Sequence, residues 1–93
     1  MNLDSLPTAI CVPAGPEKHF HLYRGSPAEM VAVMAEEMGS KSIEKTVRDI
    51  LLAIALHRRI VIRLPEGLDE ETLSAVFVCA LLDTKIARPV PLA

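Results

Sequence analysis

The pattern of apolar and polar residues in the first third of the chain predicts two β-strands, one from an apolar stretch and one from strict alternation. Residues 8–12 (TAICV) are rich in side chains that favour strands and stand between two prolines. Residues 19–24 (HFHLYR) alternate with a period of two, so we expect the more apolar face of this strand to be buried. That face carries Phe20 and Leu22, and the opposite face carries His19, His21 and Tyr23.

The next stretch changes to helical spacing, and capping residues mark both of its ends. Ser26 suits the N-cap, Pro27 suits the first helical position, and Glu29 can close a capping box onto the backbone amide of the cap. Gly39 supplies a left-handed stop. The sequence therefore predicts a first helix, with a stripe of apolar residues formed by Met30, Val33, Met34 and Met38.

A second helix is predicted from Ser40 or Ser42 to about His57. Its polar face disappears after residue 49, and a helix that is apolar on every side is buried on every side. We therefore expect either other elements of this chain or a second subunit to cover this half of the helix. The residues that replace the polar face are Leu52, Ala53, Ala55 and Leu56.

The last third of the chain predicts a strand, a helix and a short final strand. Residues 59–64 (RIVIRL) alternate, and Asp69 suits the N-cap of the third helix. Residues 85–90 can form a short strand, in which Pro89 needs an edge position because proline cannot donate to a ladder. The third helix carries its apolar face on Leu73, Val76, Phe77, Ala80 and Leu81, with Val78 and Leu82 beyond it.

The order of elements, β-β-α-α-β-α with an optional last strand, predicts a small two-layer α+β sandwich. Three helices would pack on one face of a sheet of three or four strands. A chain of 93 residues suits a single domain over 1–93. We expect residues 1–7 to form a loose lead-in and residues 89–93 a loose tail.

Composition and charge narrow the class of protein. The apolar fraction of 51% is high for a chain of 93 residues, which favours a surface shared with a partner. A net charge of −2 gives no general attraction to nucleic acid or to acidic membranes. Cys11 and Cys79 form no CxxC pair, and no apolar run approaches the roughly 20 residues of a membrane span. We expect a cytoplasmic, bacterial-type protein with reduced thiols and no membrane contact.

His19 and His21 form the pair whose spacing is compatible with a metal site. On one strand face they would lie about 6.6 Å apart, and two imidazoles need at least one further ligand. Cys11 is the candidate for that ligand, whereas the alternative places both imidazoles on a solvated face or at an interface. We expect the second arrangement. No catalytic constellation or phosphate-binding loop is present, so the sequence predicts neither an enzyme nor a bound cofactor.

The order strand, helix, helix over residues 18–57 is similar to that of ribbon-helix-helix DNA-binding regulators. The junction EEMGSKS followed by EKTVRDIL resembles the turn between the two helices of that family. The resemblance covers about 40 residues and implies a dimer with a two-stranded ribbon in the major groove. The candidate nucleic-acid or metal contacts are His19, His21, Arg58, Arg59 and Arg63.

The function that the sequence favours is nevertheless a non-catalytic module for protein–protein interaction or self-association. The methionine stripe of the first helix suits core filling first and an adaptable binding surface second. The apolar surplus of the second and third helices is the main candidate surface. The residues predicted for interaction are Met30, Met34, Leu52, Leu56, Val78 and Leu82.

Overall fold

A computed structural model describes residues 6–13 and 20–90 and confirms the predicted α+β class. It contains three helices packed with a three-stranded antiparallel sheet. The predicted lead-in and tail lie mostly outside the described residues. In chain order the elements are β1 (Ala9–Pro13), β2 (Phe20–Arg24), α1 (Pro27–Glu37), α2 (Ile43–Arg58), α3 (Glu70–Asp83) and β3 (Arg88–Pro89).

The sheet has the order β2-β1-β3, so β1 is the central strand. Ile10 lies opposite Tyr23 on β2 and opposite Pro89 on β3. Pro89 therefore occupies an edge strand, as the sequence predicted, where its missing N–H interrupts no further ladder. Cys11 lies opposite Leu22, and this pair faces the other side of the sheet because successive side chains alternate.

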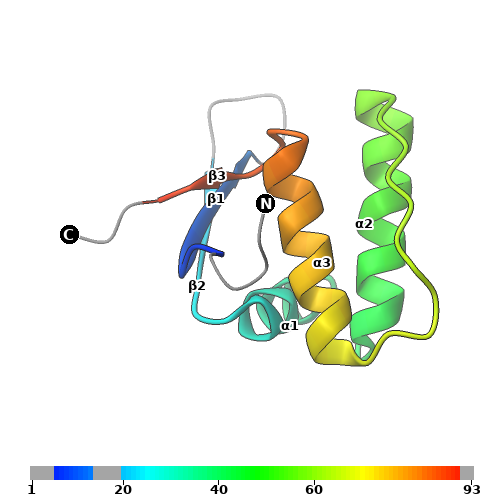
Figure 1. The fold of residues 1–93 in the computed structure, drawn as a ribbon, viewed down its shortest axis with the longest axis horizontal. Coiled ribbons are helices and arrows are strands. Elements are labelled where there is room, and N and C mark those ends of the chain that lie inside the picture. The colour runs from blue at the N-terminus through cyan, green and yellow to red at the C-terminus, as the bar shows by residue number, and fades with distance from the viewer. Residues whose placement is uncertain (1–5, 14–19, 91–93) are drawn as a thin grey trace.

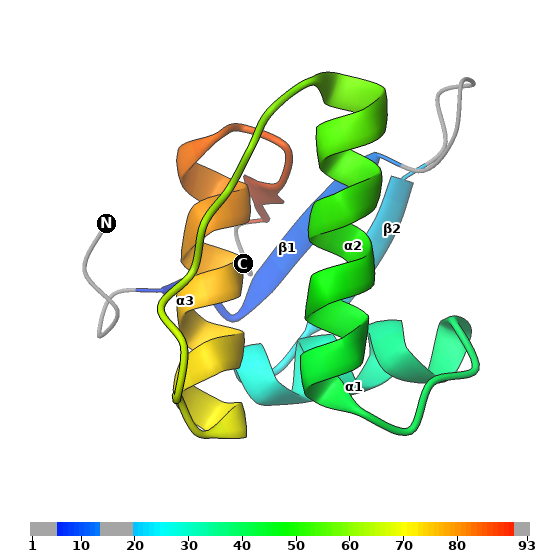
Figure 2. The ribbon, with the colours of Figure 1, turned by 90° about the vertical axis from the view of Figure 1, so that its right-hand side faces the viewer.

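The helices gather on one side of the sheet. Figure 1 places α3 between the strands and α2, and Figure 2 shows α2 passing in front of β1 and β2. α3 contacts both α1 and α2, while α1 also contacts β2. The largest fully buried apolar side chains come from β1, α1 and α3, and none comes from α2. They are Phe77, Ile10, Met30, Leu81, Val31 and Val78.

Each helix begins where the capping rules predict. Ser26 Oγ accepts a hydrogen bond from the Glu29 N–H at 3.2 Å, and Glu29 Oε1 accepts one from the Ser26 N–H at 3.2 Å. Ser42 caps α2 and Asp69 caps α3 through the same kind of bond, at 3.2 Å and 2.9 Å. Gly39 has a φ of 67°, which is the left-handed conformation expected after α1.

The buried face of β2 is the opposite of the one predicted. Tyr23 is 9% exposed, whereas Phe20 and Leu22 are 57% and 48% exposed. Tyr23 lies opposite Ile10, which is fully buried, so the face shared by these two residues is the one that meets the helices. The tyrosine can enter the core because its hydroxyl finds a partner on α1.

Residues 60–64 alternate in burial as expected, but they form no strand. Arg59 ends α2 in the left-handed conformation, with φ at 56°, and the chain then runs back along the helices (Figure 1). Ile60, Ile62 and Leu64 are half-buried and pack against the core. The alternation therefore reflects a segment with one buried side, and the helices rather than the sheet provide that side.

The outer face of the second half of α2 is not covered by the other described residues, so within residues 6–13 and 20–90 the first of the two predicted alternatives does not hold for this face. Leu52 and Leu56 are 58% and 70% exposed. α3 is instead the helix that is buried on most sides, since Val78 and Leu82 lie in the core together with Leu73 and Phe77. The outer face of α2 is thus an apolar helix surface open to solvent.

Two buried hydroxyl groups differ in their hydrogen bonding, so their removal should change the stability in opposite directions. The Thr46 hydroxyl donates to the carbonyl of Ser42 at 2.8 Å, whereas the Ser74 hydroxyl is fully buried with no hydrogen-bond partner among the described residues. We expect Ser74→Ala to raise the free energy of unfolding by about 1 kcal/mol and Thr46→Val to lower it by about 1 kcal/mol. Urea denaturation measures both changes, and a destabilised S74A variant would contradict the assignment of an unsatisfied hydroxyl.

Candidate functional site

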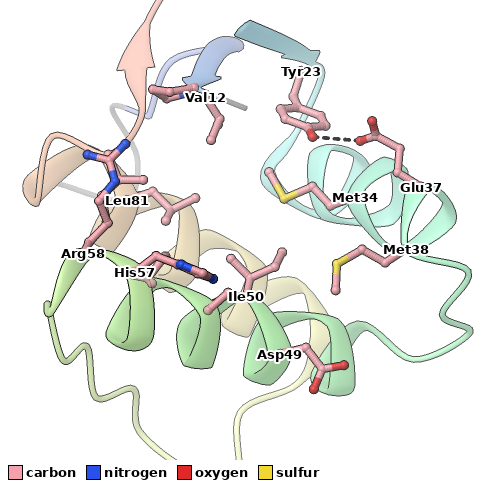
Figure 3. Close-up of a pocket in the computed structure, with 14 residues that line it drawn as sticks. Val12, Tyr23, Met34, Glu37, Met38, Asp49, Ile50, His57, Arg58 and Leu81 are labelled. Atoms are coloured by element: carbon pink, nitrogen blue, oxygen red, sulfur yellow. Dashed lines mark hydrogen bonds between the residues drawn. The ribbon is translucent and has the colours of Figure 1, made fainter. Parts of the chain in front are cut away.

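A groove of about 860 Å³ opens between α2 and the β1–β2 part of the sheet. Its lining is mainly apolar, and Figure 3 shows Met34, Ile50 and Leu81 around it, from α1, α2 and α3. The groove exists because α2 packs on α1 and α3 rather than directly on the strands. Such a hollow can accept apolar side chains or an apolar ligand without a large rearrangement.

A hydrogen-bonded cluster forms the rim of the groove on the side of α1. The Tyr23 hydroxyl donates to Glu37 Oε1 at 2.7 Å, and Glu37 Oε2 lies 3.0 Å from His21 Nδ1. The rings of His21 and Tyr23 are stacked with their centroids 6.2 Å apart. One carboxylate therefore ties two residues of β2 to the end of α1, and Figure 3 shows the contact to Tyr23.

Burial, followed by the hydrogen bond and the negative charge of Glu37, raises the pKa of Tyr23 well above its ordinary value. The phenol is therefore a donor held in its neutral form, and it does not provide a base at neutral pH. The rim cluster thus positions α1 against β2, which is a structural task.

The opposite rim of the groove carries basic side chains from the end of α2. His57 and Arg58 line the groove there, across from Tyr23 and Glu37 in Figure 3. Asp49 lies two turns earlier on the same helix and also borders the groove. The groove is therefore anionic beside Glu37 and cationic beside Arg58, with an apolar floor between the two ends.

The groove and the outer face of α2 form one continuous apolar surface. Ala53 lines the groove and is itself exposed, and Leu56 follows it by three residues on the same helix. Leu52 lies four residues before Leu56, so both leucines stand next to the groove on the outward side. This surface offers aliphatic contact area and charged borders, which suits binding.

Four of the six residues predicted for interaction are buried in the core, so they do not form an exposed surface. Met30 and Val78 are fully buried, and Met34 and Leu82 are nearly so. Of the methionines on the first helix, Met30 and Met34 therefore fill the core. Only Leu52 and Leu56 of the predicted set lie at the surface.

The predicted metal pair lies only partly within the described residues. His19 lies outside the described residues, and His21 approaches Glu37. Cys11 lies opposite Leu22 and so faces away from His21, because neighbouring residues on β2 alternate. Within residues 6–13 and 20–90, no group of three or more His, Cys, Asp or Glu side chains could hold a metal ion.

The basic residues predicted as alternative contacts lie at the end of α2 and in the segment that follows it. Arg58 borders the groove, whereas Arg59 is the exposed C-cap of α2 and Arg63 lies in the exposed positions of the segment that follows. Burial, followed by the hydrogen bond and the negative charge of Asp83, raises the pKa of the Cys79 thiol on α3, which disfavours the thiolate form that acts as a nucleophile.

Sequence reasoning missed Tyr23 and Glu37 as a pair. The available indication was that a lone aromatic hydroxyl on an alternating strand needs a partner when it is buried. The identity of that partner depends on how α1 crosses β2, and local sequence patterns do not specify that crossing.

The chain matches no protein-family model, and neither a curated protein nor a solved structure matches it at a significant level. In the part of the chain that the structure describes, none of the helices has the length and apolar character needed to cross a bilayer. The functional proposals therefore rest on the geometry of the groove and of the outer face of α2.

The alkaline titration of Tyr23 tests the rim cluster directly, because this is the only tyrosine of the chain. We expect its tyrosinate absorbance to appear well above the ordinary pKa of 10.0, and Glu37→Gln to move the transition down toward that value. Since the folded-state pKa is raised, the stabilisation by the neutral phenol is complete below pH 10.0 and is lost as the pH rises beyond it. A wild-type midpoint at the ordinary value would contradict the buried hydrogen bond.

Proposed function

We propose that this chain is a non-catalytic module that binds protein, in the first place a second copy of itself, through the outer face of α2. One observation carries the proposal: two neighbouring leucines of a well-packed helix, Leu52 and Leu56, are more than half exposed. Large apolar side chains that cluster on one surface mark interaction sites more often than scattered ones do. The groove beside them extends the same apolar surface.

Burial of this surface supplies the free energy of association. Each square ångström of apolar area removed from water contributes about 25 cal/mol before the costs of association. The two leucines and Ala53 provide the centre of the contact, and charged residues such as Asp49 and Arg59 surround it. A central apolar cluster with a polar border is the usual composition of a protein interface.

The ribbon-helix-helix resemblance and its nucleic-acid contacts stay predictions. β2 is an edge strand, as a ribbon would need, but it already pairs with β1 of the same chain. Its outward side carries Phe20, Leu22 and Arg24, which is a mainly apolar set. No contact or charge cluster among the described residues favours this function over self-association. The absence of catalysis and of a cofactor likewise stays a prediction.

Self-association predicts a mass above that of the monomer that rises with concentration. Sedimentation velocity and native mass spectrometry at two concentrations measure it. We expect Leu52→Glu or Leu56→Glu to weaken association by at least about tenfold, because each places a charge at the centre of the apolar contact.

Leu22→Glu is the matched control, since it changes the same residue type at similar exposure on the opposite side of the sheet. It should leave association unchanged. A wild-type monomer at every concentration would overturn the proposal, and a loss of association in L22E alone would move the contact to the sheet.

A further inference from the structure

Five residues on the outward side of α2 recur at the alternating intervals that are typical of the contact stripe, or seam, between two packed helices. Lys45, Asp49, Leu52, Leu56 and Arg59 follow one another at intervals of four, three, four and three residues. At 100° per residue the four helical positions, Lys45 to Leu56, fall within a single stripe on the helix, and Arg59 follows as the C-cap just beyond the last helical residue. The stripe runs between the groove on one side and the returning segment on the other, where Leu64 of that segment and Leu51 of α2 line a second hollow.

The two charged residues that flank the leucines have no partner within the described chain. Asp49 and Arg59 make no ion pair or side-chain hydrogen bond there, whereas Glu44 and Arg48 on the same helix pair with each other at 2.9 Å. Arg59 is exposed at the C-cap, and Asp49 is half-exposed at the edge of the groove. The stripe thus has an apolar centre, a free acid before it and a free base after it.

Such a stripe is complementary to itself only when the second copy runs antiparallel. With Leu52 of one helix opposite Leu56 of the other, Asp49 lies opposite Arg59, and two-fold symmetry repeats both contacts. A parallel pair would instead place Asp49 on Asp49 and Arg59 on Arg59. Lys45 extends past the end of the partner helix in the antiparallel arrangement, so it opposes no helical residue.

The neighbouring antiparallel registers are mismatched. A shift of one heptad in one direction places Leu52 opposite Asp49 and Leu56 opposite Lys45. The opposite shift places Leu56 opposite Arg59. Each shift therefore sets leucines against charged side chains and leaves the acid and base apart. Only the arrangement with Leu52 opposite Leu56 satisfies the apolar and the charged positions together.

We propose that two copies of this chain dock through α2 in this antiparallel register, with four leucines at the centre and an Asp49–Arg59 ion pair at each end. The proposal rests on the proposed self-association and specifies its geometry. Ala53 and Ala55 flank the leucines with small side chains, which lets the two helices approach closely. Both grooves stay open beside the seam.

Charge reversal in two separate chains tests the register. Asp49→Lys places like charges opposite each other at both ends of its homodimer, and so does Arg59→Glu. Mixing the two variants restores two opposite-charge contacts in the heterodimer, and the double variant D49K/R59E restores them in its homodimer. We expect each single variant to associate about tenfold more weakly than wild type, and both the mixture and the double variant to recover most of that loss.

Sedimentation at low ionic strength measures the five dissociation constants, for wild type, the two single variants, their mixture and the double variant, and circular dichroism checks that each variant is folded. K45E is a matched control, since Lys45 opposes no helical residue in this register and its reversal should have little effect. If wild type associates and L52E does not, but the mixture of D49K and R59E associates no better than the single variants, the register is wrong and self-association still holds. A monomeric wild type overturns both proposals.

Discussion

The burial of α3 on most of its sides is the constraint on which the rest of this fold depends. Phe77 and Val78 of α3 are fully inaccessible to solvent, and they share one core with Ile10 of β1 and Met30 of α1. A helix without a polar face is most stable where neighbours surround it. Once α3 takes that place between the sheet and α2, the other helices have to arrange themselves around it.

The position of α2 follows from this arrangement. It packs on α1 and α3, and the segment after Arg59 covers a further part of its surface. The side toward the strands stays partly open as the groove, and no described residue covers Leu52 and Leu56 on the side that faces away from the core. An apolar helix at the periphery of a small domain therefore retains leucines at the surface.

Local chemistry made much of the fold predictable. The N-caps of α1 and α3, the left-handed Gly39 and the edge position of Pro89 each depend on a few adjacent residues and were predicted correctly, and the cap of α2 is one of the two serines predicted for it. The strand predicted over 59–64 was wrong, because alternation indicates one buried side without identifying what covers it. A pair of helices satisfies that pattern as well as a neighbouring strand does.

The candidate site was only partly predictable, because it depends on contacts between distant elements. Leu52 on α2 and Val78 on α3 both belong to helices that lack a clear polar face, so periodicity could not decide which one reaches the surface. The face of β2 was predicted from apolar character, which favours Phe20 over Tyr23. The structure reverses this order because Glu37, fourteen residues further along, satisfies the buried hydroxyl.

The contact between Tyr23 and Glu37 also gives the molecule an internal optical reporter. The chain has one tyrosine and no tryptophan, so its near-ultraviolet emission comes from a single ring at the rim of the groove. A carboxylate that accepts a hydrogen bond from the phenol quenches tyrosine emission. Any movement that separates α1 from β2 would break the 2.7 Å bond and brighten the fluorescence. Opening of the groove can thus be followed in the unlabelled protein, on the timescale of its own motions.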